Sequence, residues 1–179
     1  MRIIAGQWRG RPLKAPPGQA TRPSSDRARE ALFSMLTSRL GAFEGLAVVD
    51  LFAGTGALGL EALSRGAASC TFVEQDRAAL DALRANIAAL GARADVRAQA
   101  VNTLGPASRP HDLMLIDPPY AMRAGVPTAE RLARLGWLAP GALVSIESAA
   151  DEPIAPSGFA LETERRYGKA KITLLRHEG

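Results

Sequence analysis

The stretch from Asp50 to Gly59 constrains the fold of this chain more than any other. It follows Leu46–Val49, a short apolar run rich in β-branched residues, which is typical of a strand buried on both faces. Glycines at positions 54, 56 and 59 have the spacing G-x-G-x-x-G, which allows a sharp turn and leaves no Cβ between the main chain and a ligand. Residues 57–65 suit a helix that Gly66 ends. The pattern predicts a strand that ends at Asp50, a tight turn, and a helix whose N-terminus faces that turn.

A carboxylate follows the next predicted strand. Ser69–Val73 is typical of a strand, and Glu74 comes directly after it. A carboxylate in that position can accept both ribose hydroxyls of a bound nucleoside. The alternative is an ordinary packing turn with a solvated Glu. Because strand, glycine turn, helix and acid occur in the expected order, we favour a nucleoside-cofactor site, which leaves a nicotinamide dinucleotide and S-adenosylmethionine (SAM) open.

Strands and helices alternate along the rest of the chain. We expect helices at 25–40, 76–90 and 124–135, and strands at 95–98, 111–117 and 143–146. Residues 160–166 and 169–176 form a predicted closing antiparallel hairpin around Gly168. The sequence therefore predicts an α/β fold of the Rossmann-like, doubly wound type, with a mostly parallel seven-stranded sheet and a C-terminal hairpin.

The basic excess of the chain lies at its N-terminus. Residues 1–30 contain seven Lys or Arg and two Asp or Glu, whereas the net charge of all 179 residues is only +4. Such an end is typical of a segment that contacts phosphate groups. We divide the chain into a basic N-terminal arm, residues 1–24, and a domain, residues 25–179.

The arm combines an aromatic residue with guanidinium groups. Arg2–Ala5 reads as a short strand, and Trp8 is followed by Arg9 and Arg11. Aromatic and Arg side chains together stack on bases and bind phosphates in RNA-binding segments. The alternatives are that Trp8 packs on the domain and that the charges are only solvated. A segment this rich in Gly and Pro is expected to add little to the core.

Charges also gather at the start of the first predicted helix. Ser24 or Ser25 can cap this helix, and Arg22, Asp26, Arg27, Arg29 and Glu30 surround the cap. Surface ion pairs would explain them but contribute little stability. Because the cluster adjoins the basic arm, we predict that it faces a site. The residues predicted to contact RNA are Trp8, Arg9, Arg11, Arg22 and Arg27.

Composition narrows the class of protein. Cys70 is the only cysteine, which rules out an internal disulfide and a zinc cluster, and we expect no bound metal. No apolar run is long enough to span a membrane, and the N-terminus lacks the apolar region of a signal peptide. We expect a cytoplasmic protein.

A second motif, Asp117-Pro118-Pro119-Tyr120, ends the fourth predicted strand. The prolines stiffen the turn and remove two N–H donors, so that the Asp117 carboxylate and the Pro118 carbonyl are free to accept. Tyr120 adds a flat aromatic face. Acceptors beside such a face suit a planar base with an exocyclic amine, namely adenine, cytosine or guanine. A rigid structural turn is the alternative reading.

The two motifs together decide the cofactor. Transfer of a methyl group to an amine requires the nitrogen to point along the methyl–sulfur bond of SAM, and acceptors stabilise the positive charge that develops on the nitrogen. A hydride-transfer enzyme has no evident use for Asp117-Pro118-Pro119-Tyr120, and no acid–base set for it is visible. We therefore predict SAM as the cofactor and Asp117, Pro118 and Tyr120 as catalytic residues.

With these motifs, the chain resembles class I SAM-dependent amino methyltransferases. The segments 2–11 and 22–30 narrow the resemblance to the RsmD family, which methylates the N2 amine of one guanine in small-subunit (16S) ribosomal RNA. The resemblance implies that Gly54, Thr55, Gly56 and Glu74 hold SAM and that Asp117 and Tyr120 face the guanine. Asp50, Phe52 and Ala53 complete the predicted cofactor-binding set. Many relatives carry Asp or Asn where this chain has Ala100, so an adenine contact there must come from other groups.

The resemblance also implies a ribosomal RNA partner, within the small ribosomal subunit or an assembly intermediate, and we expect a monomer. Two other functions stay open. One is a DNA methyltransferase acting on adenine N6 or cytosine N4, although 179 residues leave no room for a target-recognition domain. The other is a non-catalytic RNA-binding protein on a methyltransferase fold.

Overall fold

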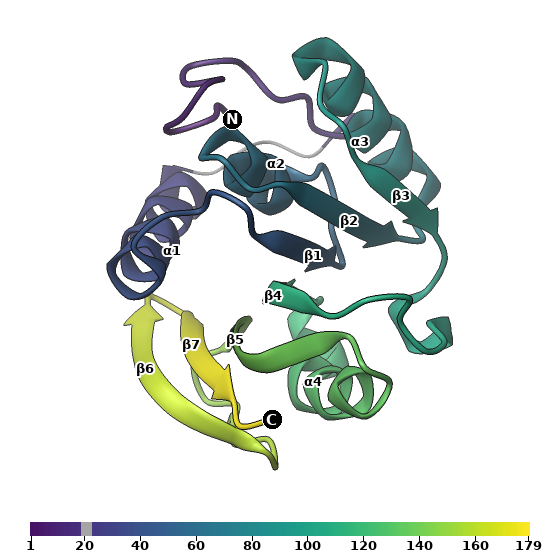
Figure 1. Cartoon of the computed structure of the whole chain (residues 1–179). Coiled ribbons are helices and arrows are strands. Elements are labelled where there is room, and N and C mark those ends of the chain that lie inside the picture. The colour runs from purple at the N-terminus through teal and green to yellow at the C-terminus, as the bar shows by residue number, and fades with distance from the viewer. Residues whose placement is uncertain (19–22) are drawn as a thin grey trace.

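The computed structural model describes residues 1–18 and 23–179. Its sheet has seven strands in the order β3-β2-β1-β4-β5-β7-β6 (Figure 1). Strands β1 to β5 pair in parallel, and β7 pairs antiparallel with both β5 and β6. The predicted fold class and hairpin are confirmed. The strands are β1 Ala47–Leu51, β2 Ser69–Glu74, β3 Asp95–Ala98, β4 His111–Ile116, β5 Leu138–Ala149, β6 Phe159–Tyr167 and β7 Ala170–His177.

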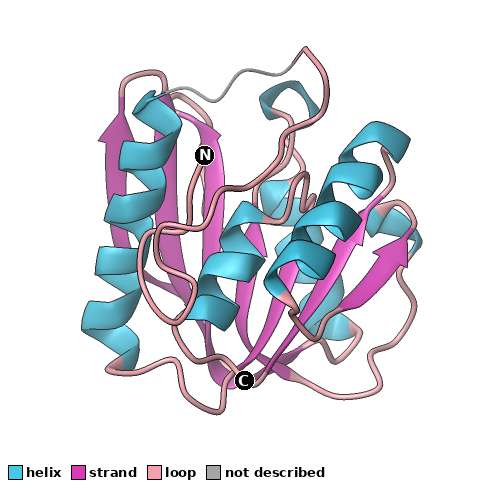
Figure 2. Ribbon diagram, turned by 90° about the horizontal axis from the view of Figure 1, so that it is seen from above, coloured by secondary structure: helices cyan, strands magenta, loops and turns pink. Residues whose placement is uncertain are grey.

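Helices cover both faces of this sheet (Figure 2). The helices α1, α2 and α3 share one core cluster with the sheet, and α4 belongs to a second cluster on the other face. Within the described ranges, no helix combines the length and apolarity needed to cross a membrane. The α-helices are α1 Pro23–Leu40, α2 Ala57–Ser64, α3 Arg77–Leu90 and α4 Gly125–Arg134, and single 3₁₀ turns occur at Val101–Thr103 and Tyr120–Met122.

Local sequence signals set the ends of α3. The Asp76 side chain accepts a hydrogen bond from the Ala79 N–H at 2.9 Å, and Gly91 ends the helix with φ 65°. Both boundaries agree with the prediction. The third glycine of the G-x-G-x-x-G motif packs α2 onto β2, because a Cβ on Gly59 would lie 2.4 Å from the Phe72 ring.

Three predicted strands were wrong in extent. β1 continues to Leu51, so Asp50 lies within the strand instead of ending it. Arg2–Ala5 is not a strand, since only an isolated bridge joins Arg2 to Pro12. β5 starts at Leu138, earlier than the expected 143, because its first residues pair with His111 before a bulge.

The N-terminal segment, residues 1–18, packs on α2 and α3. The Ile3 side chain is 2% exposed and the Leu13 side chain 7%, and both belong to the core cluster under α1. The buried Asn86 side chain of α3 accepts from the Lys14 N–H at 2.7 Å and donates to the carbonyls of Lys14 and Thr55. The expectation that this segment adds little to the core is therefore wrong. The division of the chain at residues 24 and 25 stays a prediction.

Candidate active site

The site lies where the winding of the sheet reverses. β1 and β4 are neighbours, and the chain continues from them toward opposite edges of the sheet. In such sheets, ligands bind outside the carboxyl ends of the strands at this switch point. A first cavity of about 390 Å³ and a second of about 380 Å³ open there, and Phe52 and Asp117 line both. The two cavities adjoin at these residues, and each is of the size that small molecules occupy.

The backbone of the glycine turn is held in a left-handed conformation. Phe52 has φ 57°, which is uncommon for a residue with a side chain. Its neighbour Ala53 donates an N–H to the Val73 carbonyl at 3.0 Å, which fixes the turn against β2. Gly56 has φ 85°, and a Cβ there would lie 2.4 Å from Leu83, so only glycine fits. A Cβ on Gly54 would meet nothing within 4 Å, which leaves the turn open toward a ligand.

Glu74 organises the same turn. One carboxylate oxygen accepts the Gly54 N–H at 2.8 Å, and the other accepts the N–H groups of Gln75 and Asp76 at 2.9 and 2.8 Å. Three backbone donors therefore stabilise the negative charge of this side chain. Glu74 also lines the second cavity. Its carboxylate has lone pairs left for a ribose, but it has a second task, which is to hold the glycine turn.

Asp50 is buried beneath the turn. Its carboxylate accepts the Gly59 N–H at 2.9 Å and lines the first cavity. Burial raises its pKa to about 8, and the Glu74 charge contributes, whereas the bond from Gly59 opposes the rise. Asp50 thus connects the end of β1 to the start of α2 from inside the sheet.

Asp117 comes directly after β4 and lies next to Glu147 of β5, because Ile116 pairs with Ile146. Burial raises the pKa of Asp117 well above its usual range, and Glu147 and Asp50 add to the rise. Tyr120 is 40% exposed, and burial together with Glu147 and Asp117 raises the pKa of its hydroxyl. The arrangement offers two adjacent carboxyl groups, those of Asp117 and Glu147, beside an accessible aromatic ring.

The prediction of the site omitted Glu147. It lines the first cavity with Asp117 and is the main charge near Tyr120. A signal for it exists in the sequence, because an acid at the end of the fifth predicted strand must lie at the same sheet edge as Asp117 if the two strands are parallel neighbours.

The structure does not bring Trp8 and Arg9 together with Asp117. Trp8 lies at the C-terminal end of α2. Its backbone N–H donates to the Ser64 hydroxyl at 3.0 Å, and its indole ring packs against the core. α2 starts at the glycine turn and spans roughly 10 Å. Trp8 and its exposed neighbour Arg9 are thus at the opposite edge of the sheet from the cavities.

The other residues predicted to contact RNA differ in their surroundings. Arg11 donates to the Ala89 carbonyl at 2.7 Å, which gives it a structural partner at the end of α3. Arg27 is exposed near the start of α1, close to Asp26, which lines the first cavity. Arg22 lies outside the described residues.

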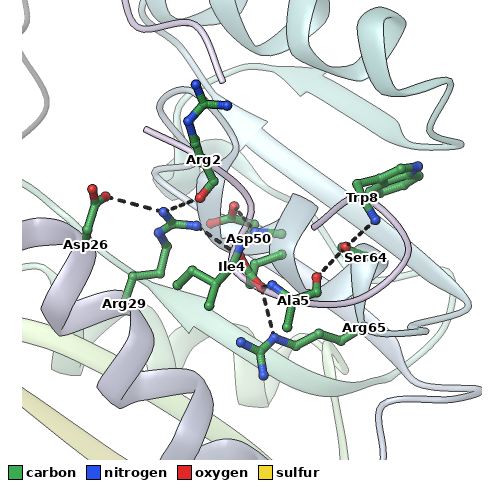
Figure 3. A network of polar contacts seen from close by, with 11 residues as sticks. Arg2, Ile4, Ala5, Trp8, Asp26, Arg29, Asp50, Ser64 and Arg65 are labelled. Atoms are coloured by element: carbon green, nitrogen blue, oxygen red, sulfur yellow. Dashed lines mark hydrogen bonds and ion pairs between the residues drawn. The ribbon is translucent and has the colours of Figure 1, made fainter. Parts of the chain in front are cut away.

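A buried carboxylate connects the N-terminal segment to the site (Figure 3). Glu61 is 0% exposed and accepts from the Ile4 and Ala5 N–H groups and from the side chains of Arg29 and Arg65. Arg29 also donates to the Arg2 carbonyl at 2.7 Å and lines the first cavity. The wall of that cavity therefore depends on a charge network that reaches into α2.

Comparisons with known proteins agree with this geometry. The family model described as "Conserved hypothetical protein 95" matches residues 1–176. The chain is 40% identical to Ribosomal RNA small subunit methyltransferase D of Escherichia coli K12, over 99% of this chain and 90% of the relative. It is 36% identical to the protein of that name from Haemophilus influenzae, over 94% of this chain and 89% of the relative.

Solved structures give the same result for the fold. The Escherichia coli protein yhhF superimposes with a TM-score of 0.87 at 38% identity, over 100% of this chain and 98% of that one. Magnesium protoporphyrin IX methyltransferase from Synechocystis, solved with bound SAM, has a TM-score of 0.65 at 14% identity, over 89% of this chain and 86% of that one. At that identity the second likeness concerns the fold alone.

Proposed function

The chain belongs to the "Conserved hypothetical protein 95" family, the RsmD family, and we propose that it transfers a methyl group from SAM to the exocyclic N2 amine of a guanine in small-subunit ribosomal RNA. The predicted family is confirmed, and the relatives from Escherichia coli and Haemophilus influenzae are named as small-subunit rRNA methyltransferases. The guanine, its N2 amine and the individual site residues belong to the proposal.

The observation that carries the proposal is the position of Asp117-Pro118-Pro119-Tyr120. This motif ends β4 at the switch point, and Asp117 lines both cavities. One cavity contains the glycine turn, and the other contains Glu74. A cofactor that spans the two cavities would pass Asp117 at its middle, which is where an amine substrate must meet it.

The residues present fit SAM. Glu74 and the open Gly54 backbone offer an acceptor and a close approach for a ribose, and Phe52 supplies an apolar wall between the two cavities. Acidic groups at the junction, Asp117 and Glu147, suit a positively charged ligand. When bound, SAM would supply the electrophilic methyl group.

The chain itself contributes orientation and charge stabilisation. We propose that the guanine ring stacks on Tyr120 while its amine donates to the Asp117 carboxylate and the Pro118 carbonyl. This fixes the direction of the nitrogen lone pair, which supplies a large part of the acceleration. Asp117 and Glu147 then oppose the positive charge on the nitrogen and, given the raised pKa of Asp117, accept the proton that leaves it.

We further propose that the substrate is a small ribosomal subunit or its assembly intermediate, met in the cytoplasm by a monomer of this chain. The relatives' names support rRNA as the substrate class. A DNA methyltransferase fits less well, because the described residues form one sheet with its covering helices and no additional unit for DNA recognition. A non-catalytic RNA-binding protein would have no use for the half-buried pair of carboxyl groups, Asp117 and Glu147.

Methyl transfer from labelled SAM to 30S particles that lack the modification tests the proposal, with nucleoside mass spectrometry to identify N2-methylguanosine. We expect Asp117→Ala to lower the rate about a hundredfold or more while SAM affinity stays nearly unchanged, because a charge-assisted acceptor at the reacting atom is lost. Unmethylated particles, label on another base, or wild-type turnover by the variant would each contradict the proposal.

A further inference from the structure

The register of the sheet places a cation, Arg165, near the site. Counting charges along the sequence does not reveal this position. Ile116 pairs with Ile146, so Asp117 and Glu147 follow as neighbours on β4 and β5. Glu147 pairs with Ile172 on β7, and Ile172 pairs with Arg165 on β6. The carboxyl pair and Arg165 therefore lie in one row across four adjacent strands.

This row points toward the first cavity. Residues paired directly across strands have side chains on the same face of a sheet. Asp117, Glu147 and Ile172 all line the first cavity. Arg165 therefore belongs to the same face, with its backbone two strands, or about 10 Å, from Glu147. A guanidinium at that distance can reach the RNA backbone beside a nucleotide held in the cavity.

Helix α1 borders the same opening. Arg39 near its C-terminal end lies 3.9 Å from Glu162 on β6, and Figure 1 shows the end of β6 beside α1. α1 runs antiparallel to β6, the outermost strand at the left of Figure 2, so its start is level with the β6–β7 turn. The exposed Arg27 is in that part of the helix. Arg27 and Arg165 thus stand on two elements that flank the opening, and we call them the phosphate rim.

The rim has no partner among the described residues. Arg27 and Arg165 are exposed, and neither makes an ion pair or side-chain hydrogen bond there. By contrast, Arg2, Arg11 and Arg29 of the basic N-terminal region donate to carbonyl groups or to Glu61. Arg27 and Arg165 are therefore unpaired cations that flank the first cavity, whereas the exposed Arg123 near Tyr120 lines a third cavity.

We propose that Arg165, together with Arg27, binds phosphate groups of the ribosomal RNA next to the target nucleotide, so that the RNA strand enters between α1 and the end of β6. This inference rests on the proposed function and names the surface that positions its substrate. Phosphate contacts of this kind set the register of a nucleic acid without reading its sequence.

The adjacent Arg166 provides a matched control. It lies on the same edge strand and is also exposed. It pairs with Lys171, whose Nζ lies 3.6 Å from Glu164, and alternation along the strand directs Arg166 to the face away from the first cavity. The two arginines differ mainly in the face of the sheet that they occupy.

The test measures the affinity of Arg165→Gln, Arg165→Lys, Arg166→Gln and wild type for unmodified 30S particles at several salt concentrations, with SAM affinity by calorimetry alongside. For Arg165→Gln we expect affinity about fivefold lower at 0.15 M salt and a salt slope shallower by about 0.7–0.9, unchanged SAM binding, and rescue by Arg165→Lys. Arg166→Gln should stay within twofold of wild type.

Wild-type slope and affinity in Arg165→Gln, or an equal loss in Arg166→Gln, would overturn the inference. Methyl transfer by the wild-type protein, measured on the same particles, tests the proposed function separately. Binding that weakens in Arg165→Gln without any methyl transfer would support the phosphate rim and contradict the enzyme assignment. Methyl transfer by wild type, with unchanged binding in Arg165→Gln, would support the enzyme assignment and contradict the phosphate rim.

Discussion

Replacing Glu61 with Ala tests how the N-terminal segment is held. The Glu61 carboxylate is fully buried and accepts the Ile4 and Ala5 N–H groups at 2.9 and 3.0 Å. It also accepts from Arg29 at 2.9 Å and from Arg65 at 3.0 Å. The variant loses all four bonds, and Arg29, which is 6% exposed, keeps only the Arg2 carbonyl and a longer contact to Asp26 at 3.4 Å.

The expected loss is large compared with the whole stability of a domain. Breaking a buried ion pair by removing one partner costs about 3–5 kcal/mol. Each backbone N–H left without an acceptor costs a further ~1–3 kcal/mol, although the losses overlap because the same groups relax together. We expect Glu61→Ala to lower the free energy of unfolding by about 4–6 kcal/mol, out of the ~5–15 kcal/mol typical of a domain. Glu61→Gln, which keeps one acceptor oxygen, should cost less.

Urea unfolding measures the loss, and limited proteolysis within residues 1–18 shows whether the segment detaches. SAM affinity should also fall, because Met1, Ala15 and Arg29 line the first cavity. Asp81→Ala serves as the control, since Asp81 is exposed on α3 and should change stability by no more than about 0.5 kcal/mol. A loss below 1 kcal/mol in Glu61→Ala, with unchanged proteolysis, would refute the argument.

Four further substitutions test the site and the N-terminal segment. Glu74→Gln should weaken SAM binding tenfold or more, as measured by calorimetry. It should also lower the melting temperature, because the new amide NH2 must face a backbone N–H donor of the turn. An unchanged melting temperature would contradict the role of Glu74 in holding the turn. The difference in melting temperature between Asp50→Asn and wild type should shift in favour of the variant as pH rises from 5 to 9. The folded-state pKa of about 8 means that the wild-type protein loses stability as pH rises from about 4 to about 8, and an equal difference at both pH values would contradict this. Arg9→Ala should lower the affinity for RNA and the slope of that affinity with salt, if the N-terminal segment contacts RNA. Arg11→Ala should instead lower the free energy of unfolding by about 0.5–1.5 kcal/mol, because the bond to the Ala89 carbonyl is lost. Identical effects of the two substitutions would contradict these separate roles.

The carboxyl ends of β2 and β4 were predicted to within one residue. Both strands are apolar runs that end at an acid, Glu74 and Asp117, and this signal is local. Asp50 was predicted at the end of β1 but lies within it. The apolar pattern cannot show that a carboxylate inside a strand accepts a hydrogen bond from Gly59, nine residues later.

The role of the N-terminal segment could not be predicted, because its partners are polar residues inside a helix. Glu61 and Ser64 are polar residues of α2, and both are buried against residues 4–8. Counting charge along the sequence likewise favoured residues 1–30 for RNA contact. Only strand register shows that Arg165, far along the chain, lies in the row of Asp117.

The bonds that seat the N-terminal segment also prescribe an order of folding. Ile4 and Ala5 bond to a residue 57 and 56 positions further along the chain, and Lys14 bonds to one 72 positions further. These residues leave the ribosome before α2 and α3 do, but their acceptors are in place only once those helices have formed on β1 and β2. Long loops must close before such contacts are gained. The segment is thus fixed after elements that are synthesised later, and in pulse-labelled refolding its amides should gain protection from exchange after those of β1.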